Sequence, residues 1–195
     1  EFDNDLHHLS DFYFVQADIV PAGTQFRGIM PLSWYRTLVV RELLGTVFGC
    51  LTQQGKSINL LEIVVGYDLS QTRLDPLLAG WLVHRLADGG EFTVVDERVT
   101  FNFRGNPVTL RWRLLNEAVP TLAIAFDDGG RVTVAVEREE SGEFRQAEAR
   151  YDGEIFTRVA DKADLASYLL AVTGRSDEFR EYAEVLRVIT MLPIP

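Results

Sequence analysis

Residues 75–103, DPLLAGWLVHRLADGGEFTVVDERVTFNF, change from a helical to a strand-like pattern, and this change decides the predicted fold. Asp75-Pro76 is a good helix start, because Asp caps the free N–H groups and Pro needs none at the first helical position. Residues 88–90, Asp-Gly-Gly, are typical of a helix end. Residues 92–95 and 99–103 follow as two short β-branched and aromatic runs. The stretch therefore predicts a helix followed by a hairpin.

Two further helices are predicted before it. From Ser33 to Leu51, apolar residues recur at steps of three and four, as on one face of a helix. Asn59-Leu60-Leu61-Glu62 has the spacing of a capping box and predicts a short helix that ends near Gly66. Three helices followed by a hairpin is the element order of a winged helix, so residues 33–104 are predicted to form a winged-helix-like module.

The remainder predicts an antiparallel sheet with two C-terminal helices. Residues 108–114 alternate between apolar and polar side chains, as a strand with one solvated face does. Hairpin turns are predicted at 127–130 and 152–153, and helices at 161–174 and from Ser176 onward. The fold class predicted is α+β, in three parts: an N-terminal extended arm at 1–32, the winged-helix-like module at 33–104 and an antiparallel α+β region at 105–195.

Composition and charge limit the class of protein. The apolar fraction is 47%, which suffices for a core, and no apolar run approaches the roughly 20 residues of a membrane span. Cys50 is the single cysteine, so no disulfide can form within the chain. These features predict a soluble, cytoplasmic protein without a membrane span. The net charge is −10, and the basic residues are 17 arginines and two lysines.

Nucleic-acid binding is the alternative that the winged-helix layout raises. Ser70, Gln71, Thr72 and Arg73 precede the third helix, where helix-turn-helix proteins contact bases. However, residues 33–104 hold seven basic and eight acidic residues. Because phosphate neutralisation supplies most affinity for nucleic acid, this balance disfavours it. A winged-helix DNA-binding transcriptional regulator is kept as the second hypothesis.

Arg85 lies in the middle of the apolar stripe of the predicted third helix. Two explanations are open. It lies in the last turn, from which its guanidinium can reach water, or it forms an ion pair with a carboxylate.

The sequence carries no motif that fixes a chemistry. It lacks a G-x-S-x-G elbow and a G-x-G-x-x-G fingerprint, and Gly55-Lys56-Ser57 is not a phosphate loop because Cys50 stands where the first glycine belongs. His7-His8 has no second cluster to complete a metal site. The expectation is therefore a protein that is not an enzyme, with no catalytic, cofactor-binding or metal-ligating residues and no cofactor.

The first hypothesis is a non-catalytic protein–protein interaction or assembly protein, an adaptor with a protein partner, and a homo-oligomer is left open. Arginine and aromatic side chains concentrate binding energy at interfaces. The alternative is that the aromatic residues fill the core and the arginines pair with acids such as Glu137 and Glu139. The partner-binding candidates are Arg111, Arg113, Phe12, Tyr13 and Phe14.

Overall fold

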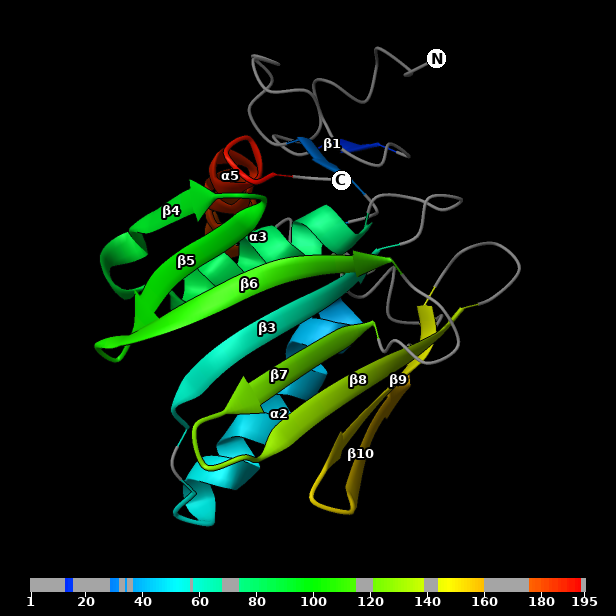
Figure 1. The fold of residues 1–195 in the computed structure, drawn as a ribbon. Helices are drawn as coiled ribbons and strands as arrows, with labels where there is room; N and C mark the ends of the chain where they lie inside the picture. Colours follow the sequence, from blue (N-terminus) through cyan, green and yellow to red (C-terminus); the bar gives the residue numbers. More distant parts are fainter. Residues whose placement is uncertain are drawn as a thin grey trace.

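One sheet of eight strands, in the order β10-β9-β8-β7-β3-β6-β5-β4, organises the chain (Figure 1). The computed structural model describes residues 13–15, 29–31, 34, 37–56, 58–67, 74–114, 121–138, 144–159 and 176–193. The strands of the sheet are β3 (Leu60–Tyr67), β4 (Phe92–Val95), β5 (Arg98–Phe103), β6 (Asn106–Leu114), β7 (Leu122–Phe126), β8 (Arg131–Arg138), β9 (Phe144–Tyr151) and β10 (Glu154–Val159).

The sheet is mixed, with its parallel pair at the centre. β3 runs parallel to β6 and antiparallel to β7, and the other neighbouring strands are antiparallel. Three hairpins close with two-residue turns in which both residues have positive φ, as in type I′ turns: Asp96-Glu97, Arg104-Gly105 and Asp152-Gly153. The second residue is glycine in two of them, where positive φ costs little, and Glu97 in the third.

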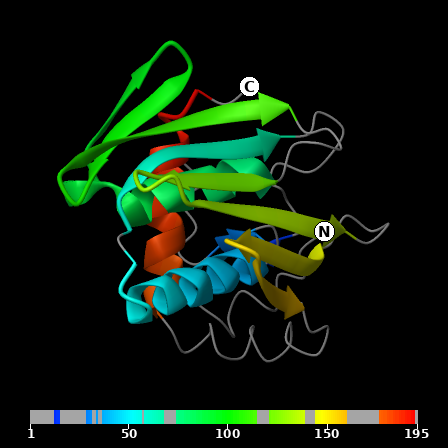
Figure 2. The ribbon, with the colours of Figure 1, turned by 60° about the horizontal axis from the view of Figure 1, so that its bottom comes forward.

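The described helices pack on one face of this sheet (Figure 2). They are α2 (Leu38–Gln53), α3 (Leu74–Leu86) and α5 (Ser176–Ile189). α2 contacts β9 and β10, α3 contacts β3 and β5, and α5 packs on α3. A short 3-10 turn, η2 (Asp88–Gly90), follows α3, and β1 (Tyr13–Val15) pairs in parallel with β2 (Ile29–Pro31). No described helix has both the length and the apolar character needed to cross a membrane.

Alternation along the strands produces the two faces. In β8, Val132 and Val134 are fully buried against the helices, whereas Arg131, which directly precedes Val132, is exposed. Because side chains of a strand point alternately to its two faces, the same pattern repeats in the neighbouring strands. The buried core lies between sheet and helices and includes Leu43, Leu44, Val47, Ile63, Val65, Leu78, Leu82, Leu110, Leu122, Ile124, Val132 and Val134.

The predicted winged-helix-like module is wrong. Residues 60–67, predicted to be its second helix, form β3, a central strand of the sheet. The capping-box spacing misled the prediction: Asn59 donates through Nδ2 to Asp127 Oδ2 at 2.9 Å. Ile63, Val64 and Val65 are buried on both faces of the sheet, which suits β-branched residues in a central strand.

Several individual elements agree with their predictions. α2, α3, the β4–β5 hairpin and α5 all form within a few residues of the predicted ranges. The helix predicted at 161–174 lies outside the described residues. The predicted domain boundary after residue 104 falls in the turn between β5 and β6, which are neighbouring strands. The division into three parts stays a prediction.

A charged contact joins the helices where Arg85 lies. Arg85 Nε is 2.5 Å from Glu181 Oε1 on α5, so the ion pair forms; the side chain is also in the last turn of α3 and 57% exposed, so both explanations hold. Trp81 Nε1 donates to the same oxygen at 3.1 Å, and Arg41 Nη1 of α2 is 3.8 Å from Glu181 Oε2. Arg41 also stacks over the Trp34 ring, 3.9 Å from its centroid. Glu181 therefore connects all three described helices.

Candidate functional site: an arginine-rich patch on the open sheet face

The face of the sheet opposite the helices carries a row of neighbouring residues from five strands. Arg111 of β6 lies beside Val64 of β3, Val64 beside Ala123 of β7, Ala123 beside Thr133 of β8, and Thr133 beside Arg150 of β9. The row therefore has an arginine at each end and small side chains between them.

The rows on either side have the same design. In one, Arg113 lies beside Gly66, and Ala135 lies beside Glu148. In the other, Glu62 lies beside Ala125, and Ala125 beside Arg131. We call these residues the open-face patch: the small residues Val64, Gly66, Ala123, Ala125, Thr133 and Ala135, bordered by Glu62, Arg111, Arg113, Arg131, Glu148 and Arg150.

Two ion pairs fix part of this border. Arg111 Nη2 donates to Glu62 Oε2 at 3.1 Å, and Arg111 Nε is 2.8 Å from Glu62 Oε1, so the two side chains form an ion pair with one hydrogen bond. On the other side, Arg150 Nε is 2.6 Å from Glu148 Oε1. Charge-assisted contacts of this kind orient a guanidinium strongly. Both pairs therefore hold their arginines in place and cancel their charge locally.

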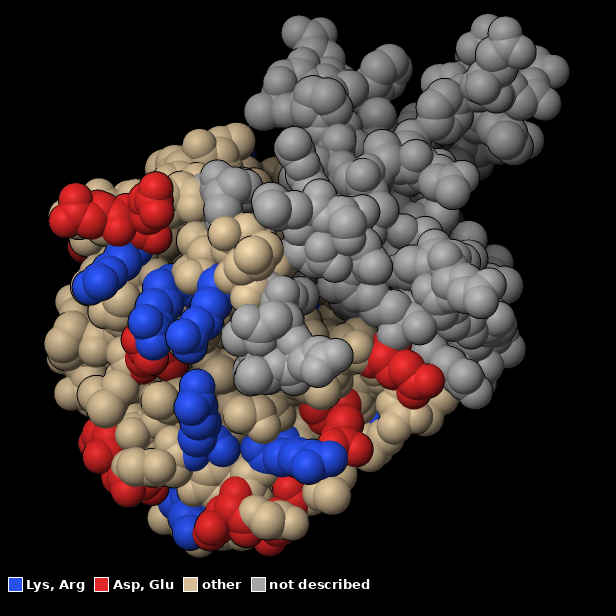
Figure 3. Space-filling model, turned by 45° about the vertical axis from the view of Figure 1, so that its right-hand side comes forward, with Lys and Arg blue, Asp and Glu red and all other residues tan. Residues whose placement is uncertain are grey.

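Arg113 and Arg131 complete the border and are exposed. Neither forms an ion pair with a carboxylate among the described residues. The open-face patch therefore carries four arginines and two glutamates, a balance of +2, in a chain of net charge −10. Figure 3 shows basic side chains in a band across this face, with acidic side chains beside it.

The chemistry of the open-face patch is that of anion binding. A guanidinium presents its N–H groups in a planar fork that matches a carboxylate or a phosphate. The patch holds no histidine or cysteine, and the described residues contain no cluster of metal-ligating side chains. Its described side chains can bind and orient a ligand. Among them, the groups that could act as a general base are the carboxylates of Glu62 and Glu148, and each is paired with an arginine.

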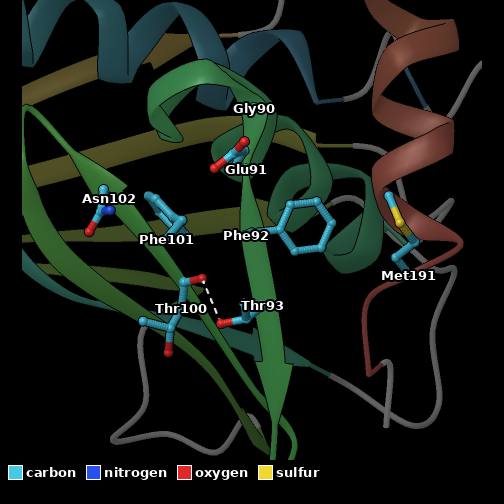
Figure 4. Close-up of a pocket in the computed structure, with 8 residues that line it drawn as sticks. All are labelled: Gly90, Glu91, Phe92, Thr93, Thr100, Phe101, Asn102 and Met191. Atoms are coloured by element: carbon cyan, nitrogen blue, oxygen red, sulfur yellow. Dashed lines mark hydrogen bonds between the residues drawn. The ribbon is translucent and has the colours of Figure 1, made fainter.

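A second feature is a hollow of about 520 Å³ beside the edge strand β4 (Figure 4). Phe92 and Phe101 of the β4–β5 hairpin and Met191, after α5, give it apolar walls. The Thr93 hydroxyl donates a hydrogen bond to the Thr100 carbonyl oxygen at 3.4 Å. Among the described residues of its lining, Glu91 is the single ionisable one. The part of its lining that the structure describes therefore holds no pair of titratable groups.

The structure places some of the candidate residues predicted from the sequence, and others lie outside the described residues. Arg111 and Arg113 lie together on the open-face patch, and the partner of Arg111 is Glu62 rather than a more distant acid. Tyr13 and Phe14 belong to β1, of which only the strand path is described, and Phe12 lies outside the described residues. The nucleic-acid candidates Ser70, Gln71, Thr72 and Arg73 also lie outside them.

Sequence reasoning missed Arg131 and Arg150 as members of the patch. Each lies at a polar position of an alternating strand, next to buried Val132 or Ala149. That alternation was the available signal for their exposure. Their placement near Arg111 depends on strand order, which alternation does not reveal.

Comparison with known proteins gives likeness of fold only. No protein-family model matches the sequence, and no curated protein matches it. An oxidoreductase from Bacillus cereus is similar at 12% identity and a TM-score of 0.41, over 86% of this chain and 64% of its own. Proposed oxidoreductases from Klebsiella pneumoniae and Yersinia pestis have TM-scores of 0.45 at 15% and 13% identity, over 85% and 84% of this chain and 59% and 61% of theirs. The chain thus spans about six tenths of the length of these proteins.

These findings correct the functional predictions. The proteins of similar fold are named as oxidoreductases, which contradicts both the non-catalytic adaptor and the prediction that the chain is not an enzyme. The DNA-binding regulator is also wrong, because β3 occupies the place of a helix that its layout requires. The activity in those names belongs to those proteins.

Proposed function

We propose that this chain binds an anionic small molecule on the open-face patch, as the substrate-binding part of an enzyme. The observation that carries the proposal is the surplus of arginine on one face of an otherwise acidic chain. An anion is repelled by most of the surface and attracted to this face, so the charge distribution itself selects the ligand class.

The positions of Arg113 and Arg131 favour an extended ligand with an anionic group at each end. Arg113 is level with Gly66, and Arg131 is level with Glu62, four residues earlier on β3. Three strand spacings across and four residues along the sheet place their α-carbons about 20 Å apart. Long side chains that lean inward shorten this gap. Val64, Gly66 and Ala123 are buried, so the body of the ligand would contact mainly Ala125, Thr133 and Ala135.

The test is isothermal titration calorimetry with linear dicarboxylates of increasing chain length. We expect one chain length to bind best, and Arg113→Ala and Arg131→Ala each to weaken its binding about tenfold, because each removes a charge-assisted contact. Arg187→Ala is the control: Arg187 is exposed on α5 and pairs with Glu184. Equal affinity for the uncharged diols, or no effect of either patch substitution, would show that the patch is not the site.

A cytoplasmic location and a protein partner belong to the same proposal. Cys50 is a free thiol, which supports a reducing compartment. Fractionation of the native host checks the location: recovery with the periplasmic or secreted fraction contradicts it.

A further inference from the structure

β10 lies at one end of the sheet and pairs with β9 on one side. Among the described strands, none pairs with its other side. Ile155 and Val159 are 59% and 58% exposed on this strand. An exposed edge strand with apolar side chains is a template for pairing with another strand, and natural proteins usually protect such an edge. β10 therefore needs an explanation for its exposed apolar residues.

The sequence of β10 is complementary to itself when two copies run antiparallel. If Phe156 faces Phe156 of a second copy, Glu154 of each copy faces Arg158 of the other. In the same register, Ile155 faces Thr157. Opposite charges directly across a strand pair are favourable, and here they occur twice because of the two-fold symmetry.

The faces of the sheet agree with this register. Phe156 lies beside buried Ala149, and Arg158 beside buried Ala147, so both point to the helix side. Glu154 is on the same side by alternation, whereas Ile155 lies beside Arg150 on the open face. Charged residues would thus meet charged residues on the helix side, and Ile155 would meet Thr157 on the opposite face.

Arg158 is already oriented for such a contact. Its Nη2 and Nε lie 2.6 Å and 2.8 Å from Glu42 Oε2 on α2. Because a guanidinium has five N–H donors, this pair leaves donors for a second carboxylate. The side chain is 49% exposed, so that carboxylate has access to it.

We propose that two copies of this chain pair antiparallel along β10, with Phe156 at the two-fold axis, to form one continuous sheet. The other edge strand, β4, also exposes apolar side chains, Val94 and Val95. Its four residues, Phe-Thr-Val-Val, contain no charge to fix a register. The charge pattern therefore favours β10, and the ligand proposed above plays no part in this inference.

The test is the molar mass of the purified chain over a range of concentrations, by light scattering after gel filtration. Wild type and the control Glu42→Gln should be dimers. In the Glu42→Gln background, Glu154→Arg and Arg158→Glu should each raise the dimer dissociation constant at least tenfold. The double substitution should restore the dimer, because it reverses both charge pairs without changing their match. A monomeric wild type, or a dimer that both single substitutions leave intact, would overturn the proposal; the second result would point to β4.

A second measurement does not depend on the charge substitutions. Ile155→Cys and Thr157→Cys, combined with Cys50→Ser, place cysteines opposite each other across the proposed axis. Mild oxidation should give a covalent dimer rapidly, because facing residues of antiparallel strands are close enough for a disulfide. Each single cysteine variant is the control and should cross-link slowly. Equal rates for single and double variants would contradict the register.

Discussion

Glu181 and Arg85 join α5 to α3 through a contact of 2.5 Å between Oε1 and Nε. The Glu181 side chain is only 12% exposed, and its two oxygens also face Trp81 and Arg41. One largely buried carboxylate therefore holds side chains from two other helices, and removing its charge should affect the packing of all three.

Glu181→Gln should lower the free energy of unfolding by about 2–3 kcal/mol, because breaking a buried charged contact leaves its partners poorly compensated. Urea denaturation measures the change. Glu184→Gln on the same helix is the matched control: its pair with Arg187 is largely exposed, so its loss should stay within about 0.5 kcal/mol. Equal losses for the two variants would show that Glu181 is not a special contact.

Gly80→Ala should destabilise the contact between α3 and α5. A Cβ at Gly80 would lie 2.6 Å from Ile189 Cγ1 and 3.2 Å from Val185 Cγ1, so the Ile189 side chain or the helices must shift. We expect a cost of about 1–3 kcal/mol, as for other overpacked cores. Gly45→Ala in α2 meets no atom within 4 Å and should raise stability by up to about 1 kcal/mol. Thermal unfolding of both variants checks the difference in sign.

Glu62→Gln should strengthen binding of the dicarboxylate, because it removes the carboxylate that occupies Arg111. A severalfold gain in affinity is expected, with a change in stability below about 1 kcal/mol for this partly exposed pair. Titration calorimetry measures the change in affinity, and thermal unfolding measures the change in stability. Glu91→Gln, in the hollow beside β4, should leave the affinity unchanged. Weaker binding by Glu62→Gln would mean that the pair with Arg111 is itself needed by the ligand.

Glu97→Gly should stabilise the β4–β5 hairpin. Glu97 has φ of 61°, a conformation that glycine adopts without steric cost. A gain of about 0.5–1 kcal/mol in the free energy of unfolding is expected, measured by urea denaturation. Glu137→Gly, within β8, is the opposite case and should lower stability, since glycine weakens a strand. A loss for both would contradict the role given to the turn.

Local patterns predicted much of the secondary structure. The alternation in 108–114 and the turn residues at 127–130 correctly predicted β6 and the β7–β8 hairpin. The helical spacing of α2 and α3 also gave the right elements. These signals are local, because alternation and helical spacing depend on residues only a few positions apart.

The order and pairing of the strands could not be predicted from such local patterns. Residues 60–65 are apolar except for Glu62, and periodicity alone does not assign so short a stretch to a buried strand or a buried helix. What makes them a strand is pairing with β6 and β7, which follow much later in the chain. The same holds for the open-face patch: Arg111 and Arg113 are neighbours in sequence, but only the strand order brings Arg131 and Arg150 near them.

The central position of β3 also has a consequence for synthesis on the ribosome. β3 is made before both of its hydrogen-bonding neighbours, so its apolar residues emerge while no partner strand exists. Until residue 126 has left the exit tunnel, this segment depends on helix α2 or on chaperones for cover. Synonymous codon changes that slow translation between residues 67 and 106 should therefore lower the yield of folded protein. They should not change the stability of the molecules that do fold.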